Sequence, residues 1–175
     1  GYADGLDRLK NFSTSDFNIQ SANIPINEVV LQPGHGKGKD IWTTSVYSYA
    51  PGGGGPGGGR DNEWLEMGGW GDSYHILIEF DLTNSPPIAL SARVELFVGE
   101  IKGDGTTGVY VDRITEFWNW RIQGTGLDHE RLWWADRPSV TQWTPGPLPA
   151  PTVGQWYSLD VTNLYNAWKV GTYPN

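Results

Sequence analysis

The stretch Tyr74-His75-Ile76-Leu77-Ile78-Glu79-Phe80-Asp81-Leu82 carries an apolar residue at every second position. Successive side chains of a β-strand point to opposite faces, so this period of two predicts a strand with one buried face. His75, Glu79 and Asp81 are expected on the outer face. The residues expected to face the core are Tyr74, Ile76, Ile78, Phe80 and Leu82.

Similar patterns recur along the chain between turn signals such as Pro33-Gly34 and Gly103-Asp104-Gly105. In the segment at 92–102, Val94, Leu96 and Val98 are expected to point inward. Each segment is long enough for one strand of a sheet. The segments expected as further strands are residues 27–32, 40–49, 92–102, 109–114 and 156–161.

Helical spacing appears near the end of the chain, in residues 162–170. Leu164, Ala167 and Trp168 stand at i, i+3 and i+4, which places them on one helix face. Asp160 or Thr162 is expected to cap the first turn, and a glycine at position 171 suits the residue after the last turn. A second short helical turn is expected at residues 115–120.

Strands at short spacing with one brief helix predict an all-β fold, a jelly-roll-like β-sandwich with one short C-terminal helix and long Gly/Trp-rich loops. A parallel α/β sheet would need a helix between successive strands, and the sequence shows no such helices. The glycine-rich run at 51–59 is expected to be a long hairpin loop.

The composition excludes several classes of protein. The chain has 175 residues, the size of one domain, and a net charge of −8 that argues against binding nucleic acid. It has no cysteine, which excludes disulfides, thiolate metal sites and a cysteine nucleophile. No apolar run is long enough for a membrane span. A cysteine-free chain that begins at Gly1 is expected to be a secreted, extracellular product.

Residues that could carry chemistry form no recognisable motif. His35, His75 and His129 lie far apart, without the spacing of a metal site. The sequence therefore predicts no catalytic residue, no metal site and no cofactor. Calcium is the one candidate ion, because turns such as Gly71-Asp72 and Gly103-Asp104-Gly105 offer oxygen ligands.

Tryptophan is the strongest compositional signal, with ten residues in the chain. A flat aromatic ring beside polar side chains suits the apolar face and hydroxyl rim of a sugar. The same rings also serve to fill a core or to stack against arginine. The tryptophans predicted as candidate carbohydrate contacts are Trp118, Trp120, Trp133, Trp134 and Trp143.

From residue 27 to the end, the chain resembles the disaggregatase-related (DNRLRE) domain, a secreted β-sandwich related to a family of carbohydrate-binding modules. The resemblance implies an extracellular, jelly-roll-like module found in surface proteins and polysaccharide-acting enzymes, some of which bind acidic polysaccharide. It carries no catalytic residue over. The segments that resemble the family are residues 30–34, 38–40, 68–70, 78–82, 92–96, 133–139 and 156–162, with Ala167-Trp168.

The resemblance departs from the family at the C-terminus. Family members continue beyond the equivalent of residues 173–175 with further strands, and here similar sequence stands in residues 5–26 instead. We therefore expect an N-terminal strand segment at 1–26 and a β-sandwich domain at 27–175. The segment either closes its own sandwich by circular permutation, completes a neighbouring subunit, or belongs to one repeat of a longer chain.

Strand exchange between subunits is the first functional hypothesis. A head-to-tail contact of this kind does not close on itself, so it predicts a non-enzymatic, secreted structural subunit that assembles into a filament or matrix of identical copies. The alternative is a monomeric polysaccharide-binding module. The apolar residues expected to insert as the assembly strand are Phe12, Phe17, Ile19, Ile24, Ile26 and Val29.

Overall fold

The computed structural model divides the chain into two compact units, residues 1–30 and residues 31–175. We describe each unit by itself. The sequence-based boundary after residue 26 lies four residues before this division. The residues that the structure describes are 27–33, 38–45, 64–69, 72–102, 108–119, 121–122 and 130–173.

Only residues 27–30 of the first unit are described. They form neither helix nor strand, and the same holds for residues 31–33 of the second unit. The strand predicted at 27–32 is therefore wrong, because a strand requires a partner for its backbone hydrogen bonds and no described strand pairs with this segment. Val29 is exposed there. The other predicted assembly residues lie outside the described part of the chain.

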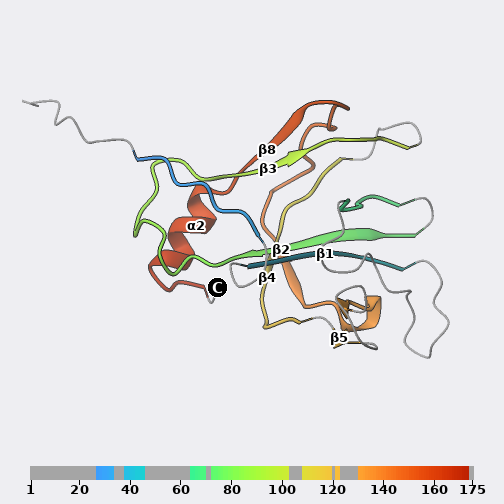
Figure 1. Cartoon of the computed structure of the whole chain (residues 1–175), viewed down its shortest axis with the longest axis horizontal. Coiled ribbons are helices and arrows are strands. Elements are labelled where there is room, and N and C mark those ends of the chain that lie inside the picture. The colour runs from blue at the N-terminus through green and yellow to red at the C-terminus, as the bar shows by residue number, and fades with distance from the viewer. Residues whose placement is uncertain are drawn as a thin grey trace, which may run out of the picture. The chain divides into compact units, whose positions relative to one another are not determined.

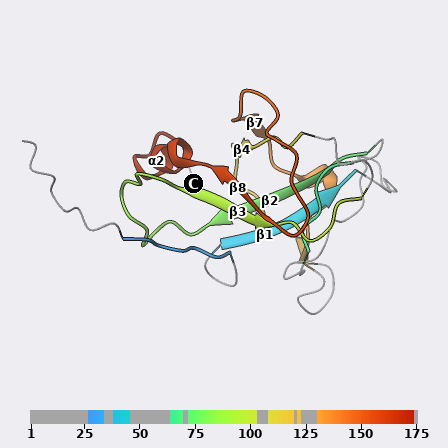
Figure 2. The ribbon, with the colours of Figure 1, turned by 90° about the horizontal axis from the view of Figure 1, so that it is seen from above.

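The longest ladder of the second unit joins β1 (Gly38–Thr44) to β2 (Tyr74–Phe80) in antiparallel register. Figure 1 and Figure 2 both show the two strands side by side. Ile41 stands opposite Leu77 at the centre of the ladder. The strand predicted from the period of two is thus confirmed over β2.

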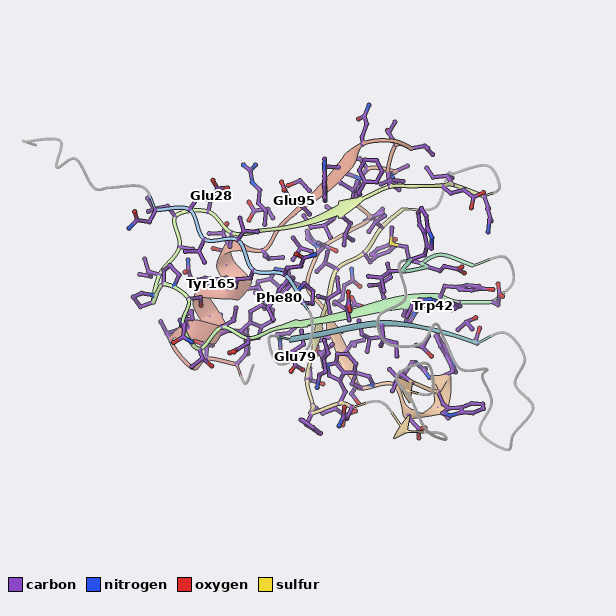
Figure 3. The ribbon with its side chains drawn as sticks, in the orientation of Figure 1. Glu28, Trp42, Glu79, Phe80, Glu95 and Tyr165 are labelled. Atoms are coloured by element: carbon purple, nitrogen blue, oxygen red, sulfur yellow. The ribbon has the colours of Figure 1, made fainter. Side chains whose placement is uncertain are left out.

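The deepest core lies on the face of β2 that the alternation assigned to solvent. Leu77 is buried with Ile41 of β1, and both pack with Trp118 and Leu132. The predicted inward residues Ile76, Ile78 and Phe80 are half-buried on the other face. Figure 3 shows Glu79 and Phe80 on opposite sides of β2. The assignment of one inner and one outer face is therefore wrong, because both faces are covered in part.

Side chains of β1 form hydrogen bonds with the two segments that contain Trp118 and Leu132. The Thr43 hydroxyl, fully buried, donates a 3.0 Å hydrogen bond to the carbonyl of Leu132. Lys39 Nζ donates to the carbonyl of Trp118 at 2.6 Å and lies 3.1 Å from Glu79 Oε2. These hydrogen bonds tie the backbone at Trp118 and at Leu132 to side chains of β1, so they help to fix both segments on the β1–β2 ladder.

A second ladder pairs β3 (Arg93–Phe97) with β8 (Trp156–Asp160), and α2 (Thr162–Lys169) follows β8 directly. The Asp160 carboxylate accepts a 2.9 Å hydrogen bond from the Thr162 N–H, which satisfies one free donor of the first helical turn. Gly171 has φ +75° after the last turn. The predicted helix and its closing glycine are confirmed.

The helix α2 packs against the loop that leads from β2 to β3. Asn166 exchanges two hydrogen bonds with the backbone of Ala89, at 2.9 and 3.0 Å. The Tyr165 hydroxyl donates to Ser85 Oγ at 3.0 Å, and Lys169 Nζ donates to the carbonyl of Leu82 at 2.9 Å. Leu164 is buried beneath these contacts. These hydrogen bonds therefore attach the loop before β3 to the helix that follows β8.

The remaining elements are short. Two small ladders pair β4 (Asp112–Ile114) with β7 (Val140–Gln142), and β5 (Arg121–Ile122) with β6 (Glu130–Arg131). The one further helical turn is η3 (Trp134–Asp136) among the residues described.

The helical turn predicted at residues 115–120 is wrong over its described part, 115–119, which contains no helix. Its first residue continues the β4–β7 ladder instead, since the Thr115 N–H donates to the Ser139 carbonyl at 3.0 Å.

The regular elements of the described residues are mostly strands, with one short α-helix, so the fold class is all-β. The strands form four separate two-stranded ladders. The glycine-rich run at 51–59 lies outside the described residues. Among the described helices, none combines the length and apolarity needed to cross a bilayer.

Leu132 provides a test of the core. Its side chain is 0% exposed, so Leu132→Ala leaves a cavity between the covering segment and the β1–β2 ladder. We expect the free energy of unfolding to fall by about 2–5 kcal/mol in urea titrations followed by tryptophan fluorescence. Val140→Ala, at an exposed position on β7, is the control and should change it by about 0.5 kcal/mol or less. Equal midpoints for both variants would contradict this core.

Candidate binding surface

The two faces of the β3–β8 ladder differ sharply in exposure. Val94 and Leu96 of β3 are half-buried and Leu159 of β8 is buried, so this face packs inward. The opposite face is exposed along its whole length, and we call it the outer face. It is formed by three cross-strand pairs: Arg93 with Asp160, Glu95 with Ser158, and Phe97 with Trp156.

Two large aromatic rings stand at one end of the outer face. Phe97 is 56% exposed and Trp156 is 67% exposed. Their ring centroids lie 5.5 Å apart with an angle of 67° between the ring planes, an edge-to-face arrangement that aromatic pairs favour. The pair therefore holds its own geometry while leaving most of its apolar surface in water.

A third ring lies close to this pair in the chain's fold. The indole of Trp64, 59% exposed, covers Gly99, two residues beyond Phe97. A Cβ at position 99 would stand 2.1 Å from Trp64 Cζ3, so only a glycine allows the ring to lie this close to the backbone. We call Trp64, Phe97 and Trp156 the aromatic platform.

Polar groups continue from the rings along the outer face. Arg93, Glu95, Ser158 and Asp160 are exposed on the same two strands, and Figure 3 shows Glu95 on β3. The five residues of β3 span about 13 Å, so a face of this length presents rings at one end and donors and acceptors along the rest. Such a surface suits an elongated ligand with both apolar patches and hydroxyl groups.

None of these three rings is among the tryptophans that the sequence predicts as carbohydrate contacts. Trp64 and Trp156 lie outside the segment 118–143 in which tryptophans are dense. The one signal for Trp156 was its place in a strand pattern, where it stands on the face opposite Tyr157 and Leu159. Period two alone predicts that Trp156 points away from the buried side of β8.

Trp118 does not offer a surface for a ligand. Its ring is 4% exposed and belongs to the core cluster with Leu132 and Leu77, while Lys39 Nζ lies 4.4 Å from the ring centroid. Its assignment as a carbohydrate contact is therefore corrected to a core role. Trp120 lies outside the described residues.

The other predicted tryptophans are half-buried and engaged with neighbouring side chains. The Arg137 guanidinium lies 3.9 Å from the Trp134 ring centroid, and the His75 ring centroid lies at 4.8 Å. Trp143 meets Tyr173 edge to face at 6.2 Å. Arg137 also donates to the Trp134 carbonyl at 2.7 Å, which fixes this stack after η3.

Trp133 is half-buried, and its indole N–H has no hydrogen-bond partner. Trp133, Trp134 and Trp143 thus present less ring surface than the aromatic platform does.

The described residues contain no group of three or more histidines, cysteines or acidic residues that could hold a metal ion. The Gly103-Asp104-Gly105 turn and Gly71 lie outside the described residues, so the calcium site stays a prediction. His35 and His129 also lie outside them.

His75 is the described residue whose ionisation is most informative near neutral pH. Burial against Trp134, and then the positive charge of Arg137, hold the pKa of His75 below its ordinary value of 6.5, while Asp112 acts in the opposite direction. The imidazole is therefore kept neutral more strongly in the folded protein than in the unfolded chain.

Comparisons of the chain with protein-family models, with curated proteins and with solved structures gave no match.

The pKa of His75 predicts a change of stability with pH. Because the folded-state pKa is the lower one, the unfolded chain binds the proton first, and stability falls as pH falls below about 6.5. Urea midpoints at pH 8 and pH 5.5 should therefore differ more for the wild type than for His75→Gln. The lowered pKa values of Asp81, Glu116 and Asp160 act at more acid pH. An identical pH dependence in both proteins would contradict this assignment.

Proposed function

We propose that this protein is a non-enzymatic polysaccharide-binding module whose aromatic platform holds the glycan. The observation that carries the proposal is the exposure of Trp64, Phe97 and Trp156 beside a polar strand face. Sugar rings have apolar C–H faces that stack on aromatic rings, and their hydroxyl groups need hydrogen-bond partners nearby. The outer face offers both kinds of group in one continuous surface.

The cost of exposing these rings supports a binding role. Single exposed apolar residues are ordinary on protein surfaces, but here two large rings touch and a third covers the backbone two residues beyond the end of β3. Burying such rings contributes on the order of 1.5–3 kcal/mol each. Because these rings are exposed in the folded protein, the free energy of burying them can contribute to binding a ligand.

The proposal extends to the finer fold and the location. We propose that the ladders belong to a jelly-roll-like sandwich and that the protein acts outside the cell. The resemblance of residues 27–175 to the DNRLRE domain supports both. Under this proposal the half-buried Trp133, Trp134 and Trp143 have mainly structural roles.

Head-to-tail assembly into a filament is a second candidate function. Its support is the ladder arrangement: among the strands described, each pairs along one edge, so β3 and β8 form a sheet of only two strands. A strand from another copy adds to a sheet edge through backbone hydrogen bonds. The separate unit at residues 1–30 contains the segment that the sequence analysis predicts as the added strand.

Two substitutions test the platform as a glycan site. Trp156→Ala removes the most exposed ring of the platform, and Gly99→Ala places a methyl group where the Trp64 ring lies. We expect each to weaken binding of a soluble polysaccharide at least about tenfold, as for an aromatic hot spot, measured by affinity gel electrophoresis.

Tyr110→Ala is the matched control, because Tyr110 is an exposed aromatic residue outside the β3–β8 ladder. Its binding should equal that of the wild type. If a glycan binds the wild type and both platform variants with equal affinity, the platform is not the site.

Deletion of residues 1–26 tests the filament. If these residues complete a neighbouring copy, the full chain forms large particles and the truncated chain is a monomer, because the inserted strand is missing. Analytical ultracentrifugation and electron microscopy of both proteins give the answer. A full chain that stays monomeric at high concentration would exclude this second function.

A further inference from the structure

The charges on the outer face set limits on the glycan it accepts. Arg93 is its one basic residue, whereas Glu95 and Asp160 are both acidic, so the face carries one more negative than positive charge. Beyond β3, Glu100 and Lys102 pair with each other at 3.4 Å and add no net charge. The chain as a whole carries −8. A polyanion would meet repulsion both at this face and at a distance.

The angle between the platform rings sets a second limit. Phe97 and Trp156 meet at 67°, so their faces do not share a plane. A flat, crystalline polysaccharide surface could lie on one ring but not on both. A single chain, whose successive sugars turn relative to one another, can place one sugar against each ring.

We infer that the outer face of the β3–β8 ladder binds a single, uncharged polysaccharide chain and rejects acidic polysaccharides. The inference rests on the proposed function and names its ligand class. It differs from the acidic polysaccharide that the family resemblance implies. The rings would supply stacking, and Arg93, Glu95 and Ser158 would exchange hydrogen bonds with neutral hydroxyl groups.

One carboxylate of this face, that of Asp160, stays ionised in mildly acid solution. Asp160 accepts the hydrogen bond from the Thr162 N–H, and this bond, more than the nearby Arg93, holds the pKa of Asp160 below its ordinary value. The carboxylate that caps α2 therefore remains ionised in mildly acid solution, where the carboxylates of an acidic polysaccharide remain ionised as well.

The binding test compares two soluble neutral polymers, a mixed-linkage β-glucan and a glucomannan, with polygalacturonate at low salt. We expect the full chain to bind at least one neutral polymer at least about tenfold more tightly than polygalacturonate. Affinity for the neutral polymer should not change with salt, because no ion pair forms. In pelleting assays, crystalline cellulose and chitin should retain less of the protein than the soluble neutral polymers bind.

A charge variant gives the sharper result. Glu95→Gln with Asp160→Asn changes the net charge of the face from −1 to +1, and the Asn oxygen can still accept the hydrogen bond from the Thr162 N–H. We expect its affinity for polygalacturonate to rise about three- to tenfold at low salt. The matched control is Asp81→Asn with Glu116→Gln, which changes the total charge equally at exposed sites outside this ladder. The control should gain much less.

The outcomes separate this inference from the proposed function. Tight binding of polygalacturonate that Trp156→Ala abolishes would overturn the inference and leave the proposed function intact. Binding to none of the polymers would overturn both. Retention on crystalline polysaccharide but not on soluble chains would overturn the single-chain assignment. If Trp156→Ala changes only the sedimentation of the free protein, the platform joins copies of this chain, and the glycan assignment is wrong.

Discussion

The described core depends on the attachment of β1 to segments far along the chain. Ile41 and Leu77 form the centre of one ladder, and Leu132 packs with both of them in the core. The Thr43 hydroxyl donates to the carbonyl of Leu132, and the Lys39 ammonium group donates to the carbonyl of Trp118. These two bonds attach the segments around Leu132 and Trp118 to β1, as the backbone bonds of a third strand would. Hydrophobic burial brings these segments to the ladder, and the polar ties fix where they lie.

The same principle organises the other end of the second unit. Asn166 and Lys169 of α2 hold the loop before β3 by its backbone, so the helix that follows β8 is tied to the segment that leads into β3. The outer face carries no comparable cover in the described structure, and there the aromatic platform stands. The Asp160 carboxylate takes part in both regions, since it accepts a hydrogen bond from the first residue of α2 and also contributes to the charge of the outer face.

The described tryptophan residues divide into those that stabilise the fold through packing and those whose rings remain exposed. Trp118 fills the core and Trp134 stacks between Arg137 and His75, so both stabilise the segments that contain them. Trp156 has neither role. The composition shows that tryptophan is abundant, but it does not show which rings are buried and which are exposed. A ring that fills a core and a ring that contacts a sugar have the same chemistry. Their difference lies in what surrounds them after folding.

The sequence by itself determined the elements whose cause is local. The period of two predicted β2, β3 and β8, and helical spacing with a closing glycine predicted α2, because side-chain direction and backbone preference act within a few residues. Only the tertiary structure decided which face of β2 is buried, that Thr115 continues the β4–β7 ladder, and that Trp64 reaches Gly99. Those outcomes depend on contacts between segments tens of residues apart, and no local pattern specifies which distant segment will cover a given face.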